Sequence, residues 1–208
     1  MTTLLLRLEG PMQSWGTQSQ FRERDTGLEP SKSGVVGLLC AALGRRREED
    51  VSDLAALRMG VRVDAPGTVA ADYHTMGGNS PVIRKERVHG WSKNAVLSTR
   101  YYLADASFLI GLEGTRGILT LVDTALSRPR WALYLGRKSF VPSVPVRLPD
   151  GLVETDLASA LHAHPPGRGT PPLRYVLEDA AGSEVRMDVP VSFAERRFAA
   201  RRIRTDWR

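Results

Sequence analysis

Three short stretches of the chain combine cations, aromatic rings and glycines in the way that phosphate-binding and base-binding sites require. The most compact is "YLGRKS", residues 134–139, which holds an aromatic ring, a glycine, two cations and a hydroxyl. Such groups can stack on a base and bind the phosphate beside it. A solvated turn after a strand is the alternative interpretation, and it is the more common one.

The stretch "PSKSGVVG", residues 30–37, has the composition of a helix N-terminus that could hold an anion. The first backbone N–H groups of a helix lack partners within it, and the helix dipole favours negative charge there. Gly34 would let a phosphate approach the backbone closely. The GxxxxGK[ST] pattern of nucleotide hydrolases is missing, and an ordinary capped helix is the alternative.

The stretches "DYHT" and "STRYY", residues 72–75 and 98–102, supply a histidine, an arginine and several tyrosines. Metal-independent ribonucleases use such residues to move protons and to stabilise the pentacovalent phosphate. Tyr73 and His74 are adjacent, however, so a strand would send their side chains to opposite faces. A structural hydrogen bond is the alternative role for His74.

The opening turn "GPMQSWG", residues 10–16, follows an apolar strand, and we expect Pro11 and Gly16 to shape a loop there. Trp15 either stacks on a base or anchors this loop. At the other end of the chain, "RRFAARRIRTDWR" places six arginines within thirteen residues. That segment is either a track for phosphates or a basic tail.

The composition indicates a soluble cytoplasmic protein with a basic surface. The net charge is +6, and only four of the 29 basic residues are lysine. Arginine binds phosphate bidentately and stacks on bases, which favours nucleic acid as a partner, although a GC-rich genome would produce the same bias. The single cysteine, Cys40, and four scattered histidines give no disulfide framework and no zinc spacing. No stretch is long and apolar enough for a transmembrane helix, and the N-terminus is typical of a strand and not of a signal peptide.

The apolar patterns predict an α+β fold in one domain, residues 1–208. Strands are predicted at Thr3–Gly10, Met59–Ala65 and 106–114, and helices at 29–44, 51–58 and 116–129. A polar insertion over residues 66–104 is expected to form a hairpin with a mobile tip. Residues 173–208 are expected to form a hairpin that turns at Ala181–Gly182, followed by a basic strand. The order β-α-β-insertion-β-α-β is that of the ferredoxin-like, or RNA-recognition, fold.

Six motifs, taken in order, resemble the CasD family, a small backbone subunit of the type I-E CRISPR Cascade surveillance complex. They are "LRLEGPMQSWG", "SKSGVVGLLCAALG", "DYHT", "YLADASF", "PRWALYLGRKS" and "FAERRF". The resemblance implies a ferredoxin-like domain with an extended β-hairpin thumb, and no cofactor, metal or catalytic residue. It also implies binding to the 5′ handle of the CRISPR RNA, contact with the adjoining backbone subunit and the large subunit, and no membrane association.

Carried onto this sequence, the resemblance gives a set of candidate RNA-binding residues in four places. These are the opening turn, the helix start, the "YLGRKS" segment and the thumb: Gln13, Ser14, Trp15; Lys32, Ser33, Gly34; Tyr134, Gly136, Arg137, Lys138; and Tyr73, His74, Arg100, Tyr101. We therefore interpret the sequence as a non-catalytic receptor for an RNA end. Two alternatives remain, a metal-independent endoribonuclease that processes repeat RNA and an adaptor that binds only proteins.

Overall fold

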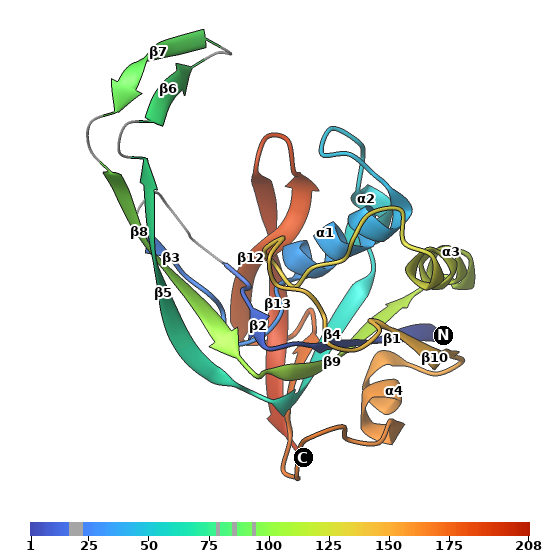
Figure 1. The fold of residues 1–208 in the computed structure, drawn as a ribbon. Coiled ribbons are helices and arrows are strands. Elements are labelled where there is room, and N and C mark those ends of the chain that lie inside the picture. The colour runs from blue at the N-terminus through green and yellow to red at the C-terminus, as the bar shows by residue number, and fades with distance from the viewer. Residues whose placement is uncertain (17–22, 78–79, 85–86, 93–94) are drawn as a thin grey trace.

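A seven-stranded antiparallel sheet forms the centre of the computed structural model, which describes residues 1–16, 23–77, 80–84, 87–92 and 95–208 (Figure 1). The strand order is β10-β1-β9-β4-β11-β13-β12. The bounds are β1 Thr2–Glu9, β4 Arg58–Ala65, β9 Ser107–Gly114, β10 Arg147–Val153, β11 Arg174–Glu178, β12 Glu184–Ser192 and β13 Arg197–Trp207. The prediction of a mixed α+β chain is confirmed.

The neighbouring strands β1 and β9 are buried on both faces, which explains their long apolar runs. β1 and β9 pair over their whole length, from Thr2 opposite Gly114 to Glu9 opposite Ser107. Leu4, Leu6 and Leu8 of β1 belong to the larger core, whereas Leu5 belongs to a smaller core on the other face of the sheet. Both faces of β1 are therefore covered, and its leucines follow one another without alternation.

Two helices, with a short third, cover one face of the sheet: α1 (Lys32–Leu43), α3 (Arg116–Ser127) and α2 (Ser52–Ala55). α1 begins three residues inside the predicted segment 29–44 and ends at Leu43, next to the predicted cap Gly44. Ser31 caps its start by accepting a hydrogen bond from the Gly34 N–H, and Gly44 ends it in the left-handed conformation. α3 is amphipathic and packs Leu119, Val122 and Leu126 on the core.

A fourth helix, α4 (Leu157–Ala163), covers part of the opposite face and closes the smaller core. Its Leu157 and Leu161 are buried against Leu5, Leu109 and Leu177 of the sheet. Over β1, β9, β4 and β11, the sheet is thus enclosed between two layers. No described helix is long and apolar enough to span a membrane.

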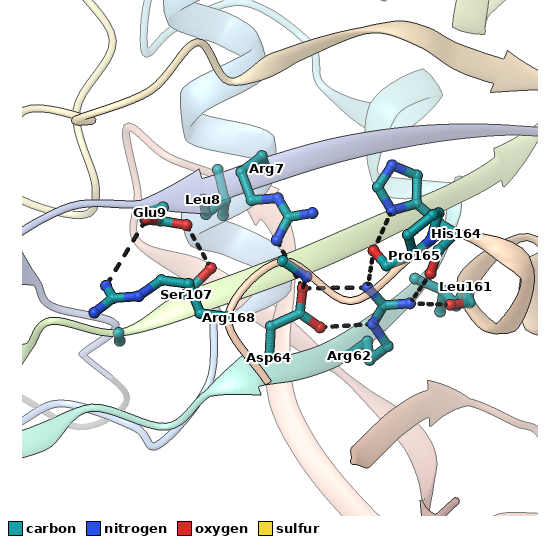
Figure 2. Close-up of polar contacts among 12 residues, drawn as sticks. Arg7, Leu8, Glu9, Arg62, Asp64, Ser107, Leu161, His164, Pro165 and Arg168 are labelled. Atoms are coloured by element: carbon teal, nitrogen blue, oxygen red, sulfur yellow. Dashed lines mark hydrogen bonds and ion pairs between the residues drawn. The ribbon is translucent and has the colours of Figure 1, made fainter. Parts of the chain in front are cut away.

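A buried ionic network holds the segment after α4 against the sheet (Figure 2). The Asp64 carboxylate accepts hydrogen bonds from Nε of Arg62 at 2.6 Å and from Nη1 of Arg7 at 2.7 Å. Nη2 of Arg62 donates to Asp64 as well, and Nη1 and Nη2 together donate to the carbonyls of Leu161, His164 and Pro165. Because the Arg62 and Asp64 side chains are almost wholly buried, Arg62 depends on Asp64 for its counter-charge.

The insertion predicted over residues 66–104 leaves the sheet as a long two-stranded arm, formed by β5 (Thr68–Gly77) and β8 (Ala95–Ala104). Figure 1 shows β6 (Ser80–Arg84) and β7 (Arg87–Ser92) at the far end of this arm. The predicted mobility of its tip concerns residues that lie partly outside the described ones. Two short strands pair with the root of β8, namely β2 (Met12–Gln13) and β3 (Glu23–Arg24).

The prediction of a hairpin that turns at Ala181–Gly182 is wrong about which strands pair. β11 and β12 are connected through that turn, but β13 lies between them and pairs with both. The reason is that β13 carries Ile203 and Arg201, which are buried and require a position inside the sheet. Local turn residues predict the reversal of the chain but not which strand returns to fill the gap.

Replacing Asp64 with asparagine is expected to destabilise the fold strongly. Asp64→Asn leaves the buried guanidiniums of Arg62 and Arg7 without a counter-charge, a loss that typically costs about 3–5 kcal/mol. Urea unfolding at pH 7 measures the change in the free energy of unfolding. The exposed Asp150→Asn variant is the control and should change it by less than about 0.5 kcal/mol. Equal effects of the two variants would contradict the role given to the network.

Candidate nucleic-acid interface

Three of the segments predicted to bind RNA meet in the structure, although they lie far apart in the sequence. The N–H of Ser14 in the opening turn donates to the carbonyl of Leu135 at 3.1 Å. At the helix start, a Cβ atom added to Gly34 would lie 2.8 Å from Cε3 of Trp15. The opening turn is therefore packed between the start of α1 and the "YLGRKS" segment, residues 134–139.

The "YLGRKS" segment is a tight turn whose glycine is required by its backbone and by its neighbour. Gly136 has φ +86°, and a Cβ atom there would lie 1.7 Å from the carbonyl oxygen of Ser14. The turn closes on itself, since the Leu135 N–H donates to the Phe140 carbonyl at 2.7 Å and the Phe140 N–H to the Arg137 carbonyl at 2.8 Å. Residues 131–135 before it form no strand, so the alternative interpretation, a solvated turn after a strand, is wrong about the strand.

The opening turn is held by its own buried side chains. Nε2 of Gln13 donates to the carbonyls of Leu8 and Ala106, and Nε1 of Trp15 donates to Oε1 of Gln13 at 3.2 Å. Oγ of Ser14 donates to the carbonyl of Tyr101 in β8. Because the Trp15 ring is buried, it anchors the loop, which is one of the two roles that the sequence left open.

The helix start already holds an anion, and that anion belongs to the protein. The backbone N–H of Lys32 donates to Asp188 in β12 at 2.8 Å. The Lys32 ammonium is buried and donates to both carboxylate oxygens of Glu178, at 2.9 and 3.0 Å. Burial lowers the pKa of this lysine, and the hydrogen bond to Glu178 opposes that change. Lys32 therefore fixes α1 to the C-terminal strands instead of projecting its charge outward.

A groove of about 980 Å³ runs between α1 and residues 131–138. Small residues of α1 form part of its lining, and Tyr134, Trp131 and Phe193 supply aromatic rings. Four cations also line it, and among the described contacts only one of them, Arg45, has a carboxylate partner, Asp53. The predicted site residues on the groove are Ser33, Gly34, Tyr134, Gly136 and Lys138, and the cations are Lys138, Arg45, Arg46 and Arg47.

Three arginines gather at the root of the arm. Arg24 of β3 lies directly opposite Arg100 of β8, and Nη2 of Arg137 donates to the carbonyl of Tyr101 at 3.1 Å. Burial and the charges of Arg100 and Arg24 lower the pKa of the Arg137 guanidinium. The carboxylates of Asp72 and Asp25 act on the pKa of Arg137 in the opposite direction. Asp72 lies opposite Arg100 on β5 and is hydrogen-bonded to His74. Like charges placed opposite one another are destabilising, so this cluster is suited to an added anion.

The remaining predicted residues lie on the arm and do not form a catalytic pair. Tyr73 is 63% exposed, whereas His74 shares the face of Asp72 and is hydrogen-bonded to its carboxylate through Nε2. Alternation along β5 therefore separates the phenol from the imidazole, as the sequence predicted. Within the described residues, no group of three His, Cys, Asp or Glu side chains could hold a metal ion.

Sequence reasoning missed several members of this interface. Arg24 was not selected, although "FRER" places charges just after the opening turn. Residues 45–47 were not selected either, and they line the groove together with Trp131 and Phe193. Their signal in the sequence was a block of three arginines next to the helix end at Gly44.

The family model described as "CRISPR-associated protein (Cas_Cas5)" matches residues 3–204, almost the whole chain. The chain belongs to the Cas5 family. Its motifs had indicated this resemblance, which is now confirmed. The chain is 33% identical over 217 residues to "CRISPR system Cascade subunit CasD" of Escherichia coli (strain K12), an alignment that covers 95% of this chain and 92% of that protein.

Two solved structures are similar to this Cas5 family chain over nearly its full length. One is described as "Crystal structure of Cas protein", with 50% identity, a TM-score of 0.80 and coverage of 99% of this chain and 94% of the other. The second is a chain of a "CRISPR RNA-guided surveillance complex", with 34% identity, a TM-score of 0.79 and coverage of 99% and 89%.

Replacing Gly136 with alanine is expected to disturb the meeting of the two turns. The added Cβ would overlap the Ser14 carbonyl and require an unfavourable positive φ, which together cost roughly 1–3 kcal/mol. Thermal unfolding measures the loss. Gly117→Ala in α3 is the matched control, because nothing lies within 4 Å of its added Cβ. That control should be neutral or stabilising, by up to about 1 kcal/mol, and a neutral Gly136→Ala would contradict the packing described.

Asp188 is expected to make stability depend on acid pH. Burial alone would raise the pKa of its carboxyl, but hydrogen bonds and charge from Arg201, together with the Lys32 N–H, lower it below its ordinary value. A carboxyl with a lowered pKa in the folded state adds stability above its unfolded pKa of about 3.9, and that stability is lost as the pH falls through the folded pKa.

The difference in the free energy of unfolding between wild type and Asp188→Asn should therefore be about 3 kcal/mol at pH 7 and shrink below about pH 4. Urea titrations at several pH values measure it. Glu195→Gln, which removes a surface ion pair with Arg197, is the control and should cost less than about 1 kcal/mol at every pH. A difference that does not change with pH would contradict the assignment.

Proposed function

We propose that this Cas5 family chain is a non-catalytic, cytoplasmic subunit of a type I-E surveillance complex that binds the 5′ handle of the CRISPR RNA. In this proposal, β1-α1-β4-β9-α3-β10 is the ferredoxin-like unit, and the β5–β8 arm is the thumb. The chain contacts the adjoining backbone subunit and the large subunit. The similarity to a Cascade subunit and to a chain of a surveillance complex supports this assignment.

The observation that carries the proposal is the cationic, aromatic groove beside the place where the opening turn packs against the "YLGRKS" segment. Single-stranded RNA is bound where bases stack on aromatic rings and phosphates meet arginine or lysine. Tyr134 and Trp131 supply rings in the groove, and Lys138, Arg46 and Arg47 supply charges. The small side chains of α1 leave room for bases between them. The buried Gln13, Trp15 and Lys32 act as supports that hold this surface in place.

The arm root extends the same surface toward the thumb. Arg24, Arg100 and Arg137 are drawn together there, and a phosphate between them would relieve their repulsion. We place at this point the turn of the RNA from handle to guide. Tyr73 and His74 lie farther along the arm and would contact the RNA beyond that turn, whereas Tyr101 follows Arg100 on the root side and would contact the RNA at the turn itself.

In this proposal, RNA does not bind the face of the sheet that α4 covers. Proteins of the RNA-recognition fold stack bases on that face of their sheet. Here α4 and the Arg62–Asp64–Arg7 network cover it over β1, β9 and β4. The side of the sheet covered by α1 and α3, which carries the groove, is the remaining basic surface next to the arm.

The main alternative is a metal-independent endoribonuclease, in which His74, oriented by Asp72, would act as a general base. Its weakness is that Tyr73 points to the other face of β5 and Arg100 lies among cations that suit binding. The alternative predicts cleavage without any metal, which one experiment separates from binding.

The test is an incubation of the purified protein, in chelator, with labelled mature CRISPR RNA and separately with labelled repeat RNA. We expect binding to the handle with no cleavage of the repeat. Lys138→Gln and Arg137→Gln should each weaken binding about tenfold and lower its dependence on salt by roughly one phosphate contact. A discrete cut at the handle boundary that is lost in His74→Ala would contradict the proposed non-catalytic receptor and support the endoribonuclease.

Arg116→Gln is the matched control, because Arg116 is an exposed arginine on α3 whose partner is Glu154 and which does not line the groove. It should bind like wild type. A loss equal to that of Lys138→Gln would mean that net charge, and not the groove, determines affinity. No binding by any variant or by wild type would favour the adaptor that binds only proteins.

A further inference from the structure

The face of β12 and β13 that lies on the α4 side of the sheet is uncovered within the described chain. Leu177 of β11 is buried in the α4 core, and Arg204 of β13 lies directly opposite it, so the two share a face. Side chains alternate along β13, so Phe198, Ala200 and Arg202 share this face as well. All three are exposed. The cover provided by α4 thus ends at β11.

The side chains of β12 complete an apolar strip on that face. Val185 lies directly opposite Arg202. Arg186 pairs with Glu29 and Asp188 accepts from the Lys32 N–H, both on the α1 side of the sheet. Met187 between them therefore points to the α4 side. Val185 is 52% exposed, Met187 63% and Phe198 39%. With Ala200, these residues form what we call the C-terminal strip: Val185, Met187, Phe198 and Ala200.

Cations stand at both ends of the C-terminal strip. Arg202 borders Val185, and the only described contact of its guanidinium is with the carbonyl of Gly182. At the other end, the exposed Arg196 lies in the turn just before β13. Arg197 faces the α1 side by the same alternation and is paired with the exposed Glu195. A neighbour that covers the strip would therefore match it with an apolar centre and carboxylates toward its ends.

The edge of β12 is protected, so the face and not the edge is the available surface. β12 is the last strand of the sheet, and its pairing with β13 shifts register between Arg186 and Val189 and again between Pro190 and Ser192. Bulges and a proline on an edge strand discourage the addition of another strand. Contiguous exposed apolar side chains on the face carry no such protection and mark an interaction site.

We propose that the C-terminal strip is a docking surface for another protein subunit, one that presents an apolar patch flanked by aspartate or glutamate. Three of the four strip residues are aliphatic or small and cannot stack on bases, which favours protein over RNA. The surface also lies on the opposite side of the sheet from the proposed RNA groove. This inference goes beyond handle binding and uses only the proposed membership of a multi-subunit complex.

The test places a photo-crosslinking amino acid at Met187 in the co-expressed complex and identifies the crosslinked peptides by mass spectrometry. We expect peptides of a different protein subunit in which aliphatic or aromatic residues lie near aspartate or glutamate. Crosslinks to RNA, crosslinks to a second copy of this chain, or an absence of crosslinks in the assembled complex would each overturn the proposal.

A second measurement compares Met187→Glu with wild type by native mass spectrometry of the complex at limiting concentration. We expect about a tenfold or greater loss of assembly with one partner, since a charge of the same sign as the partner's rim is introduced into an apolar centre. Leu121→Glu, at a half-exposed position on α3, is the matched control and should assemble normally. Unchanged thermal unfolding and RNA affinity of Met187→Glu confirm that the fold and the groove are intact.

The two proposals fail in different ways. If the wild-type chain enters no complex and binds no handle RNA, the proposed function is wrong. If the wild-type chain assembles and Met187→Glu assembles equally well, only the docking surface is wrong.

Discussion

The approach of Gly136 to the carbonyl of Ser14 is the contact on which the arrangement of the interface depends. It brings the turn at residues 134–139 against the opening turn, at a distance that only a glycine permits. The opening turn in turn pairs with β8 through β2, and Trp15 packs on Gly34 of α1. One backbone contact thereby relates the groove, the helix start and the root of the arm. A larger residue at position 136 would separate all three.

Buried charges hold the two layers of helices on the sheet from opposite sides. On one side, Asp188 accepts from the Lys32 N–H and from Arg201, while Glu178 accepts from the Lys32 ammonium, so α1 is attached to the C-terminal strands. On the other side, Arg62 and Asp64 attach the segment after α4. Such pairs add little net stability over apolar packing, but the loss of one partner leaves a buried charge. They specify which surfaces meet.

Arginine has three physical roles in this chain, and composition alone does not separate them. Arg62 and Arg201 are buried and form ion pairs with Asp64 and Asp188 inside the protein. Arg24, Arg100 and Arg137 are gathered with an excess of like charge, which suits a phosphate. Arg202 borders an apolar strip on the far face. Four of the six arginines near the C-terminus lie on β13, where alternation divides them between two faces. They are therefore neither a continuous phosphate track nor a tail.

The sequence by itself determined the local elements and the family. The cap at Ser31, the helix end at Gly44, the apolar run of β9 and the insertion between β4 and β9 all follow from residues near one another in the chain. Tertiary structure alone decided which cations remain exposed, because Lys32 is neutralised by Glu178, far along the sequence, and Arg24 meets Arg100 through strand pairing. It also decided that β13 lies between β11 and β12, since the burial of Ile203 and the pairing of Arg201 with Asp188 depend on contacts that no local pattern records.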